Sequence, residues 1–353
     1  MKRVILKDVK SMVTESVERA PCPADGLVVK VKACGVCATD VKIYNYGHHL
    51  LKLPRVLGHE VAGVIAEVGE QVTDRFKVGA RVAVCAVVNC GECIYCQRAV
   101  PSMCEGLEAF GYHYDGGFQE YMVVPNKAIR CGGVNVLGDR ISFAEASIAE
   151  LLACAINGQH LSDLQLGQSV LIIGSGPVGI LHAQLARARG ASAVFLVDID
   201  PEKLKMAQKI CGPGLTGTIH NSNEHEFLDH VSGITGGHGF DQVMLCCSVG
   251  GVQRMSFECV AKMGCVNFFG GLPKGHSMVE LDTNHIHYKQ CRVVGTHGSS
   301  ALENRLALQM IDCGLIQAKS LITDTIEVEQ LEDALQMNER NAKRLKCVVA
   351  FSD

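Results

Sequence analysis

The spacing of hydrophobic residues changes about half-way along the chain. Residues 1–150 contain short apolar runs broken by glycine, proline and aspartate, and two of these runs, 26–33 and 80–86, predict strands. From about residue 168 onward, apolar runs alternate with longer stretches of helical period. The first of these runs, 169–173, is uninterrupted, as expected of a strand that is buried on both faces. The pattern therefore predicts a β-rich region followed by a region of alternating strands and helices.

The alternation predicts parallel βαβ units. The expected strands cover residues 169–173, 193–197, 242–246 and 265–269, and the expected helices cover 177–189, 201–210 and 251–262. Two amphipathic helices, 301–313 and 329–338, and a strand over 347–351 follow. We therefore predict an α/β protein in which a nucleotide-type domain is inserted between two parts of a mostly β domain.

Composition narrows the classes of function. A length of 353 residues favours two domains, and 48% hydrophobic with 20% charged residues is ordinary for a globular protein. The formal net charge of −4 argues against nucleic acid as a partner, and no apolar run of roughly eighteen residues indicates a membrane span. The start of the chain turns polar too soon for a signal peptide, so we expect a cytoplasmic protein with reduced cysteines.

Four of the eighteen cysteines form a motif within residues 88–106: Cys90, Cys93, Cys96 and Cys104. Their spacing allows one short lobe to wrap four sulfurs around a tetrahedral Zn²⁺. Four thiolates leave no open position, so such a zinc stabilises a fold and performs no chemistry. The alternative is that the four cysteines are unrelated.

A glycine-rich turn follows the uninterrupted strand. Gly174, Gly176 and Gly179, with Pro177 and Val178 between the last two, match the dinucleotide fingerprint. The helix that they open would direct its N–H groups at a pyrophosphate. Asp198 ends the next strand nineteen residues after Gly179, where a carboxylate binds an adenosine ribose, and Asp200 would further repel a 2′-phosphate. The pattern favours NAD over NADP. Lys203 follows the second strand of this region and is a further candidate for cofactor binding.

Three separate segments supply ligands for a second, open zinc site. Cys37 provides a thiolate, His59 and Glu60 provide an imidazole and a carboxylate, and Glu150 is an acid within an apolar run. Three protein ligands leave a position for substrate, and Zn²⁺ there would act as a Lewis acid. Taken singly, each residue has an ordinary structural explanation, and the sequence alone does not show that the segments meet.

The run Gly58-His59-Glu60-Val61-Ala62-Gly63, with Gly69 and Val72 downstream, resembles the signature of zinc-dependent alcohol dehydrogenases. The chain resembles the medium-chain dehydrogenase/reductase superfamily over nearly its whole length. The segment 37–44 and the segment around Glu150 are similar to the sorbitol-type polyol and threonine dehydrogenase branch. The resemblance implies a GroES-like catalytic domain over 1–151 and 293–353, and a Rossmann domain over 152–292.

The resemblance also implies roles for single residues. Cys37, His59 and Glu60 or Glu150 would hold the catalytic zinc, and Asp40 would orient His59. The Thr39 hydroxyl would relay the substrate proton toward solvent through the cofactor ribose. Ala38 stands where the ethanol branch often has an arginine, which makes Lys346 a candidate for the pyrophosphate. The resemblance implies cofactor binding for three residues that follow the last strand of the α/β region: Gly270, Gly271 and Leu272. In this family, four histidines would lie on segments that border the cleft: His48, His49, His113 and His297.

These expectations describe an enzyme that transfers hydride between NAD(H) and a secondary alcohol, most simply a polyol, a sugar alcohol or its phosphate. L-Threonine is the alternative substrate, although no clear arginine is available for its carboxylate. A zinc-stabilised binding module without catalysis is a further alternative. Relatives are commonly homodimers or homotetramers. The histidines of the segment 284–288 are expected to bracket a strand and not to form a third metal site.

Overall fold

The computed structural model describes residues 1–336 and 344–352. The chain forms two compact units. The β-rich unit comprises Met1–Ala153, Ser299–Gly314 and Ala318–Asp353, and the α/β unit comprises Cys154–Gly298 and Leu315–Gln317. The second expected boundary, between residues 292 and 293, falls inside a strand of the α/β unit. The observed boundary lies six residues later because that strand is hydrogen-bonded into the parallel sheet.

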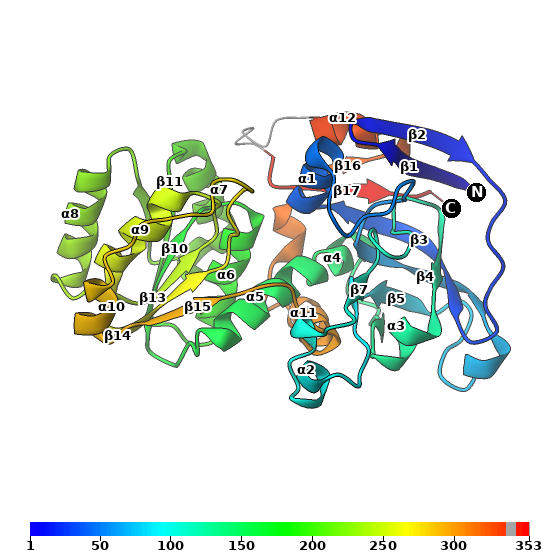
Figure 1. The fold of residues 1–353 in the computed structure, drawn as a ribbon, viewed down its shortest axis with the longest axis horizontal. Coiled ribbons are helices and arrows are strands. Elements are labelled where there is room, and N and C mark those ends of the chain that lie inside the picture. Colours follow the sequence, from blue (N-terminus) through cyan, green and yellow to red (C-terminus); the bar gives the residue numbers. More distant parts are fainter. Residues whose placement is uncertain (337–343, 353) are drawn as a thin grey trace. The chain divides into compact units, whose positions relative to one another are not determined.

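The α/β unit is built on a six-stranded parallel sheet with the order β12-β11-β10-β13-β14-β15. This is the strand order of a Rossmann fold, so the predicted fold of this unit is confirmed. The sheet is shown in Figure 1 in green to orange, and its strands are β10 (Ser169–Ile173), β11 (Ala193–Asp198), β12 (Gly217–His220), β13 (Phe240–Leu245), β14 (Val260–Phe268) and β15 (Arg292–Gly295).

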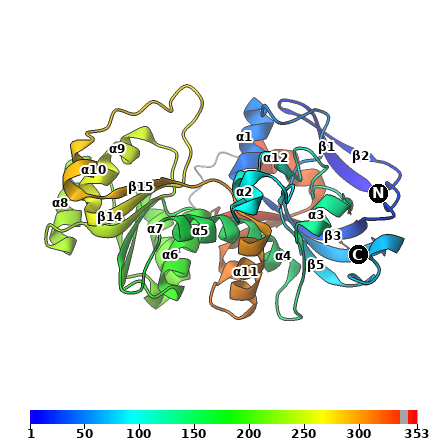
Figure 2. The same ribbon diagram turned by 60° about the horizontal axis from the view of Figure 1, so that its bottom comes forward.

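Helices pack against this sheet, with α9 and α10 across the sheet from α6 (Figure 2). The central strand β10 is buried because it pairs with both β11 and β13, which explains its uninterrupted apolar sequence. The helices of this unit are α6 (Pro177–Ala188), α7 (Pro201–Cys211), α8 (Glu224–Thr235), α9 (Gly250–Cys259) and α10 (Asn284–Lys289), with a 3₁₀ turn at Gly212–Gly214.

The β-rich unit contains a seven-stranded sheet. Six strands follow the order β16-β17-β3-β4-β5-β9, and β8 also pairs with β3. The strands are β3 (Leu27–Val36), β4 (Glu60–Val68), β5 (Arg81–Val84), β8 (Tyr121–Val124), β9 (Val134–Val136), β16 (Ile322–Ile326) and β17 (Lys346–Ala350). Two two-stranded antiparallel sheets complete the unit, β1 (Lys2–Asp8) with β2 (Ser11–Ser16) and β6 (Val87–Val88) with β7 (Glu108–Ala109).

Short helices connect the strands of this unit. They are α1 (Ala38–Tyr46), α2 (Ile94–Gln97), α3 (Asn126–Arg130), α4 (Phe143–Ser147), α11 (Ala301–Asp312) and α12 (Leu331–Gln336), with 3₁₀ turns at Glu70–Val72, Pro101–Met103, Ala318–Leu321 and Val328–Gln330. Helix α5 (Ala149–Leu161) begins in the β-rich unit and continues into the α/β unit. Of the predicted helix 329–338, the last two residues lie outside the described residues. Among the described residues, no helix combines the length and apolar composition that a membrane span needs.

Two predicted elements are wrong. The segment 284–288 was expected to belong to a strand, but it forms helix α10. Asp282 stabilises the first turn of this helix, because its Oδ1 accepts the Asn284 N–H at 2.9 Å. The strand expected at 265–269 begins at Val260, and the helix before it ends at Cys259. Val260 pairs with Phe240 in the neighbouring strand, and this pairing overrides the helical pattern of the local sequence.

Candidate active site

The four cysteines of the lobe lie around one point in the β-rich unit. Their sulfurs are all within 4.8 Å of one another, with 3.4 Å between Cys104 Sγ and Cys90 Sγ and 3.9 Å between Cys90 Sγ and Cys96 Sγ. Zn–S bonds of about 2.3 Å in a tetrahedron require sulfurs about 3.8 Å apart. A disulfide needs about 2.05 Å. The spacing therefore fits a zinc ion and excludes disulfide pairing among these residues.

Backbone N–H groups lower the pKa of two of these thiols and so favour the thiolate form that binds a metal. The N–H groups of Cys96 and Glu105 lower the pKa of Cys93 to about 6, and those of Glu92 and Cys93 lower the pKa of Cys90. Burial raises the pKa of Cys104 to about 12. Zinc binds the thiolate form, so loading this lobe would release the proton of Cys104.

Cys37 stands at the N-terminus of α1, where it is the N-cap residue. Asp40 lies in the first turn of the helix and closes a capping box, because its Oδ2 accepts the Cys37 N–H at 2.9 Å. The other carboxylate oxygen of Asp40 is 3.5 Å from His59 Nδ1. Asp40 therefore connects the start of the helix with the imidazole, as a carboxylate that orients a metal-binding histidine does.

His59 and Glu60 come from the start of β4, and the structure brings them together with Cys37. One ligand atom of each residue lies within 4.8 Å of the others. Burial lowers the pKa of the His59 imidazole, but the Asp40 carboxylate outweighs burial and holds this pKa well above its usual range. A neutral imidazole with its proton on Nδ1, the nitrogen that faces Asp40, would leave Nε2 free to bind a metal.

The position of Glu60 depends on a glycine in the neighbouring strand. Gly35 in β3 pairs with Glu60, and a Cβ atom on Gly35 would lie only 1.9 Å from Glu60 Oε2. Any other residue at this position would push the carboxylate away. Glu60 Oε2 is buried without a hydrogen-bond partner among the described residues, so the pocket offers one unused carboxylate oxygen. An unpaired oxygen, an imidazole and a thiol fit a zinc ion.

Lys346 supplies the charge that compensates Glu60. Its Nζ donates to Glu60 Oε1 at 2.6 Å and to Val36 O at 2.9 Å, and the Lys346 side chain is 4% exposed. Burial lowers the pKa of Lys346, but the Glu60 carboxylate outweighs this and raises it. The structure directs this ammonium group at Glu60, and a contact of Lys346 with a pyrophosphate stays a prediction.

Replacing Lys346 by methionine is expected to lower the free energy of unfolding by about 3–5 kcal/mol, because Glu60 is left as an uncompensated buried charge. Urea denaturation at neutral pH measures the change. Lys77→Met, at an exposed position, is the matched control and should change stability by less than about 0.5 kcal/mol. Equal stability of the two variants would show that another group neutralises Glu60.

Glu150 and Thr39 lie at the edge of this cluster. Glu150, in the first turn of α5, is not among the ligand atoms that gather with Cys37, although its charge acts on Tyr112 and Lys346. Its exchange onto the metal stays a prediction. Thr39 is the second residue of α1 and is half-buried. The proton relay through its hydroxyl also stays a prediction.

The glycine fingerprint closes the turn between β10 and α6. Gly174 has a φ of 112°, which favours glycine, and a Cβ on Gly179 would lie 1.8 Å from Gly174 O. A Cβ on Gly176 would meet no protein atom within 4 Å, so the space beside it is free for a ligand. Gly176 offers no side chain to cap α6, so the backbone of Val178 and Gly179 presents its N–H groups to an anion.

Asp198 is held beside this turn. Its Oδ2 accepts from the N–H and the hydroxyl of Ser175 at 2.8 and 2.9 Å, and its Oδ1 accepts from Asp200 N–H at 3.0 Å. The carboxylate keeps lone pairs for a ribose. Asp200 is the N-cap of α7, where it accepts from the N–H groups of Glu202 and Lys203. Gly270, Gly271 and Leu272 follow β14, and Gly270 packs on Cys247 O, where a Cβ would be 2.4 Å away.

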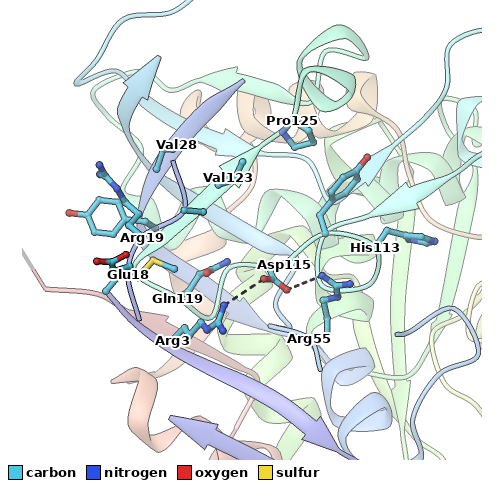
Figure 3. Close-up of a pocket in the computed structure, with 14 residues that line it drawn as sticks. Arg3, Glu18, Arg19, Val28, Arg55, His113, Asp115, Gln119, Val123 and Pro125 are labelled. Carbon is cyan, nitrogen blue, oxygen red and sulfur yellow. Dashed lines mark hydrogen bonds and ion pairs between the residues drawn. The ribbon is translucent and has the colours of Figure 1, made fainter. Parts of the chain in front are cut away.

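A separate cavity of about 290 Å³ in the β-rich unit contains none of these residues. Figure 3 shows Arg3 and Arg55 on either side of Asp115 in its wall, where Arg55 Nη1 donates to Asp115 Oδ1 at 2.9 Å. His113 lines this cavity. Its Nδ1 accepts the Ala109 N–H at 3.2 Å, which is a structural role within its own turn.

Comparison with known proteins shows the family of this chain. Family models match residues 23–131 as an alcohol dehydrogenase GroES-like domain and residues 177–312 as a zinc-binding dehydrogenase. D-arabinitol dehydrogenase 1 of Uromyces fabae is 30% identical over 319 residues, which cover 88% of this chain and 86% of that protein. This chain belongs to the zinc-type medium-chain alcohol dehydrogenases. It is therefore an oxidoreductase that uses zinc and a nicotinamide cofactor, as predicted.

Two further similarities extend over nearly the whole dehydrogenase. Sorbitol dehydrogenase of Bacillus subtilis is 28% identical over 340 residues, covering 95% of this chain and 93% of the relative. The crystal structure of a zinc-binding dehydrogenase from Sinorhizobium meliloti bound to NADP has a TM-score of 0.89 and 31% identity, and the match covers 99% of each chain. The GroES-like and Rossmann folds are thus both confirmed.

Sequence reasoning missed three residues that shape these sites. Gly35 lies two residues before Cys37, and Ser175 lies inside the glycine-rich turn. The pairing of Gly35 with Glu60 and the hydrogen bonds of Ser175 to Asp198 are visible only in the structure. Tyr112 lies beside His59, with 6.3 Å between the ring centroids. No signal in the sequence distinguishes this tyrosine from the others.

Proposed function

We propose that this dehydrogenase oxidises a secondary hydroxyl group of a polyol to a ketone with NAD as the hydride acceptor. The observation that carries this proposal is the cluster of Cys37, His59 and Glu60, in which one buried carboxylate oxygen has no partner among the described residues. Zinc bound there would polarise the substrate oxygen as a Lewis acid. The similarity to sorbitol and D-arabinitol dehydrogenases supports the class of substrate.

The protein residues divide the remaining work. The Asp40 carboxylate faces His59 Nδ1 with one oxygen and accepts the Cys37 N–H with the other. One carboxylate therefore fixes the position of the imidazole relative to the Cys37 thiolate. Thr39, two residues after Cys37, would accept the proton of the substrate hydroxyl at Oγ1 while its own hydroxyl proton passes toward solvent through the cofactor ribose. Lys346 keeps the buried Glu60 charge compensated. Position and charge are what the protein contributes, since the nicotinamide supplies the hydride chemistry.

NAD is the proposed cofactor in preference to NADP. Ser175 and the backbone of Asp200 hold the Asp198 carboxylate at the end of β11, where a 2′-phosphate would meet a negative charge. The side chain of Asp200 adds a second carboxylate two residues later. Because a relative of known structure is bound to NADP, the preference for NAD over NADP has to be measured.

We also propose a reducing compartment, the cytoplasm, and a homodimer or homotetramer. All eighteen cysteines are described and none of them forms a disulfide bond, which supports a reducing compartment. Strand β15 ends the parallel sheet and pairs only with β14 within the described residues, while its Val293 side chain is 39% exposed. An apolar strand at a free sheet edge is a surface on which a second copy can pair.

The test is a screen of the purified protein for NAD⁺ reduction with sorbitol, arabinitol, inositols, sorbitol 6-phosphate and L-threonine, alongside zinc analysis. We expect about two zinc ions per chain, the highest kcat/KM with a polyol, and a preference for NAD⁺ over NADP⁺ of at least about tenfold. L-Threonine as the best substrate would replace the polyol proposal. One zinc per chain with no dehydrogenase activity would contradict the open site.

A further inference from the structure

A row of rings leads away from the cluster of Cys37, His59 and Glu60. The Tyr112 ring centroid lies 6.3 Å from that of His59, and the His48 ring meets Tyr112 edge-on at 5.2 Å. His49 packs on His48 with 4.4 Å between the centroids. All these residues belong to the β-rich unit, so the row is a feature of one compact unit. We call it the ring wall.

The Tyr112 hydroxyl is available to a ligand. Among the described residues, none forms a hydrogen bond with it, although the ring is half-buried. A phenol is protonated at neutral pH, so the Tyr112 hydroxyl can donate a hydrogen bond beside the His59 ring.

His48 offers a second neutral donor. Its Nδ1 accepts the Leu50 N–H at 3.3 Å, so in the neutral ring the proton lies on Nε2. Burial lowers the pKa of His48, and the neighbouring His49 lowers it further. The ring wall thus presents a phenol O–H and an imidazole N–H without positive charge. Of the cationic side chains nearest in sequence, Lys52 points to solvent as an exposed residue and Arg55 donates to Asp115.

We propose that Tyr112 and His48 bind a hydroxyl group on the carbon next to the one that is oxidised, and that the substrate is an uncharged polyol. This inference rests on the proposed function and specifies its substrate. A hydroxyl group both donates and accepts, so it matches a phenol and a neutral imidazole. A phosphate would instead require arginine or lysine side chains. A site that hydrogen-bonds a substrate hydroxyl discriminates strongly against the analogue that lacks it.

The minimal substrate pair for the test is 2,3-butanediol and 2-butanol, which differ only in the adjacent hydroxyl group. Tyr112→Phe removes one oxygen atom and keeps the ring. We expect its kcat/KM to fall about tenfold with 2,3-butanediol and with sorbitol, and less than about twofold with 2-butanol, because only the first two lose a hydrogen bond. His48→Phe keeps the ring edge on Tyr112 and should show the same selective loss.

Binding provides a second readout. Calorimetric titration of the zinc-loaded protein with sorbitol should show weaker binding to Tyr112→Phe than to the unsubstituted chain. The matched control is Tyr288→Phe, which removes the same atom from a ring that is 74% exposed in the other unit, and it should change neither measurement. Sorbitol 6-phosphate should be a poorer substrate than sorbitol.

The possible outcomes separate two kinds of failure. An equal loss with 2-butanol and 2,3-butanediol would mean that Tyr112 acts only on the structure of the site, and no loss would mean that it does not contact substrate. A preference for sorbitol 6-phosphate would overturn the uncharged substrate. If the unsubstituted protein oxidises no alcohol at all, the proposed function itself is wrong, and this inference falls with it.

Discussion

Replacing Cys37 by serine is expected to lower kcat about a thousandfold and to leave the fold intact. The thiolate is one of three clustered ligands, and a Lewis acid contributes several kcal/mol to catalysis at such a site. Serine is a preferred N-cap residue, so the capping box of α1 with Asp40 can persist. The measurements are kcat with the best polyol, thermal unfolding, and zinc content, which should fall by about one ion per chain.

The matched control for this variant is Cys313→Ser, which makes the same atomic change at an exposed thiol outside both clusters. It should keep full activity and both zinc ions. Near-normal turnover of Cys37→Ser with an intact structural zinc would show that the open site lies elsewhere. Loss of both zinc ions together with cooperative unfolding would show that the two sites are not independent.

Replacing Cys96 by serine is expected to destabilise the protein. Cys96 lies in α2, and its sulfur is one of the four that surround a single point. Structural zinc adds its binding free energy to folding, so the loss of one thiolate should lower the free energy of unfolding by at least about 3 kcal/mol. For a unit of this size this corresponds to a fall in Tm of about 10 °C. Differential scanning calorimetry with zinc analysis measures both effects.

The zinc that remains identifies the site affected. Cys96→Ser should keep about one zinc ion per chain at the open site, in contrast to Cys37→Ser, which should keep the ion of the lobe. A chelator that removes the lobe zinc from the unsubstituted protein should reproduce the fall in Tm. A Cys96→Ser variant with unchanged Tm and two zinc ions would contradict a closed four-thiolate site.

Local sequence predicted four of the six strands of the parallel sheet, but it did not predict β12, β15 or helix α8. The expected strand 169–173 has the bounds of β10, because a strand paired on both sides is apolar throughout and ends at the glycine that begins the phosphate turn. The helix expected from residue 177 begins there because proline suits the first helical position. Predictions were wrong where a short segment had little pattern of its own, as in helix α10, or where pairing with Phe240 decided the start of β14.

The closed lobe and the dinucleotide turn were determined by the sequence itself, since their residues are close along the chain and local spacing sets their geometry. The open site was decided by tertiary structure. The pairing of β3 with β4 places Gly35 under the Glu60 carboxylate, and the pairing of β17 with β3 brings in Lys346 from 286 residues away. Which distant groups share a buried charge depends on strand register and burial, and these emerge only when the whole core packs.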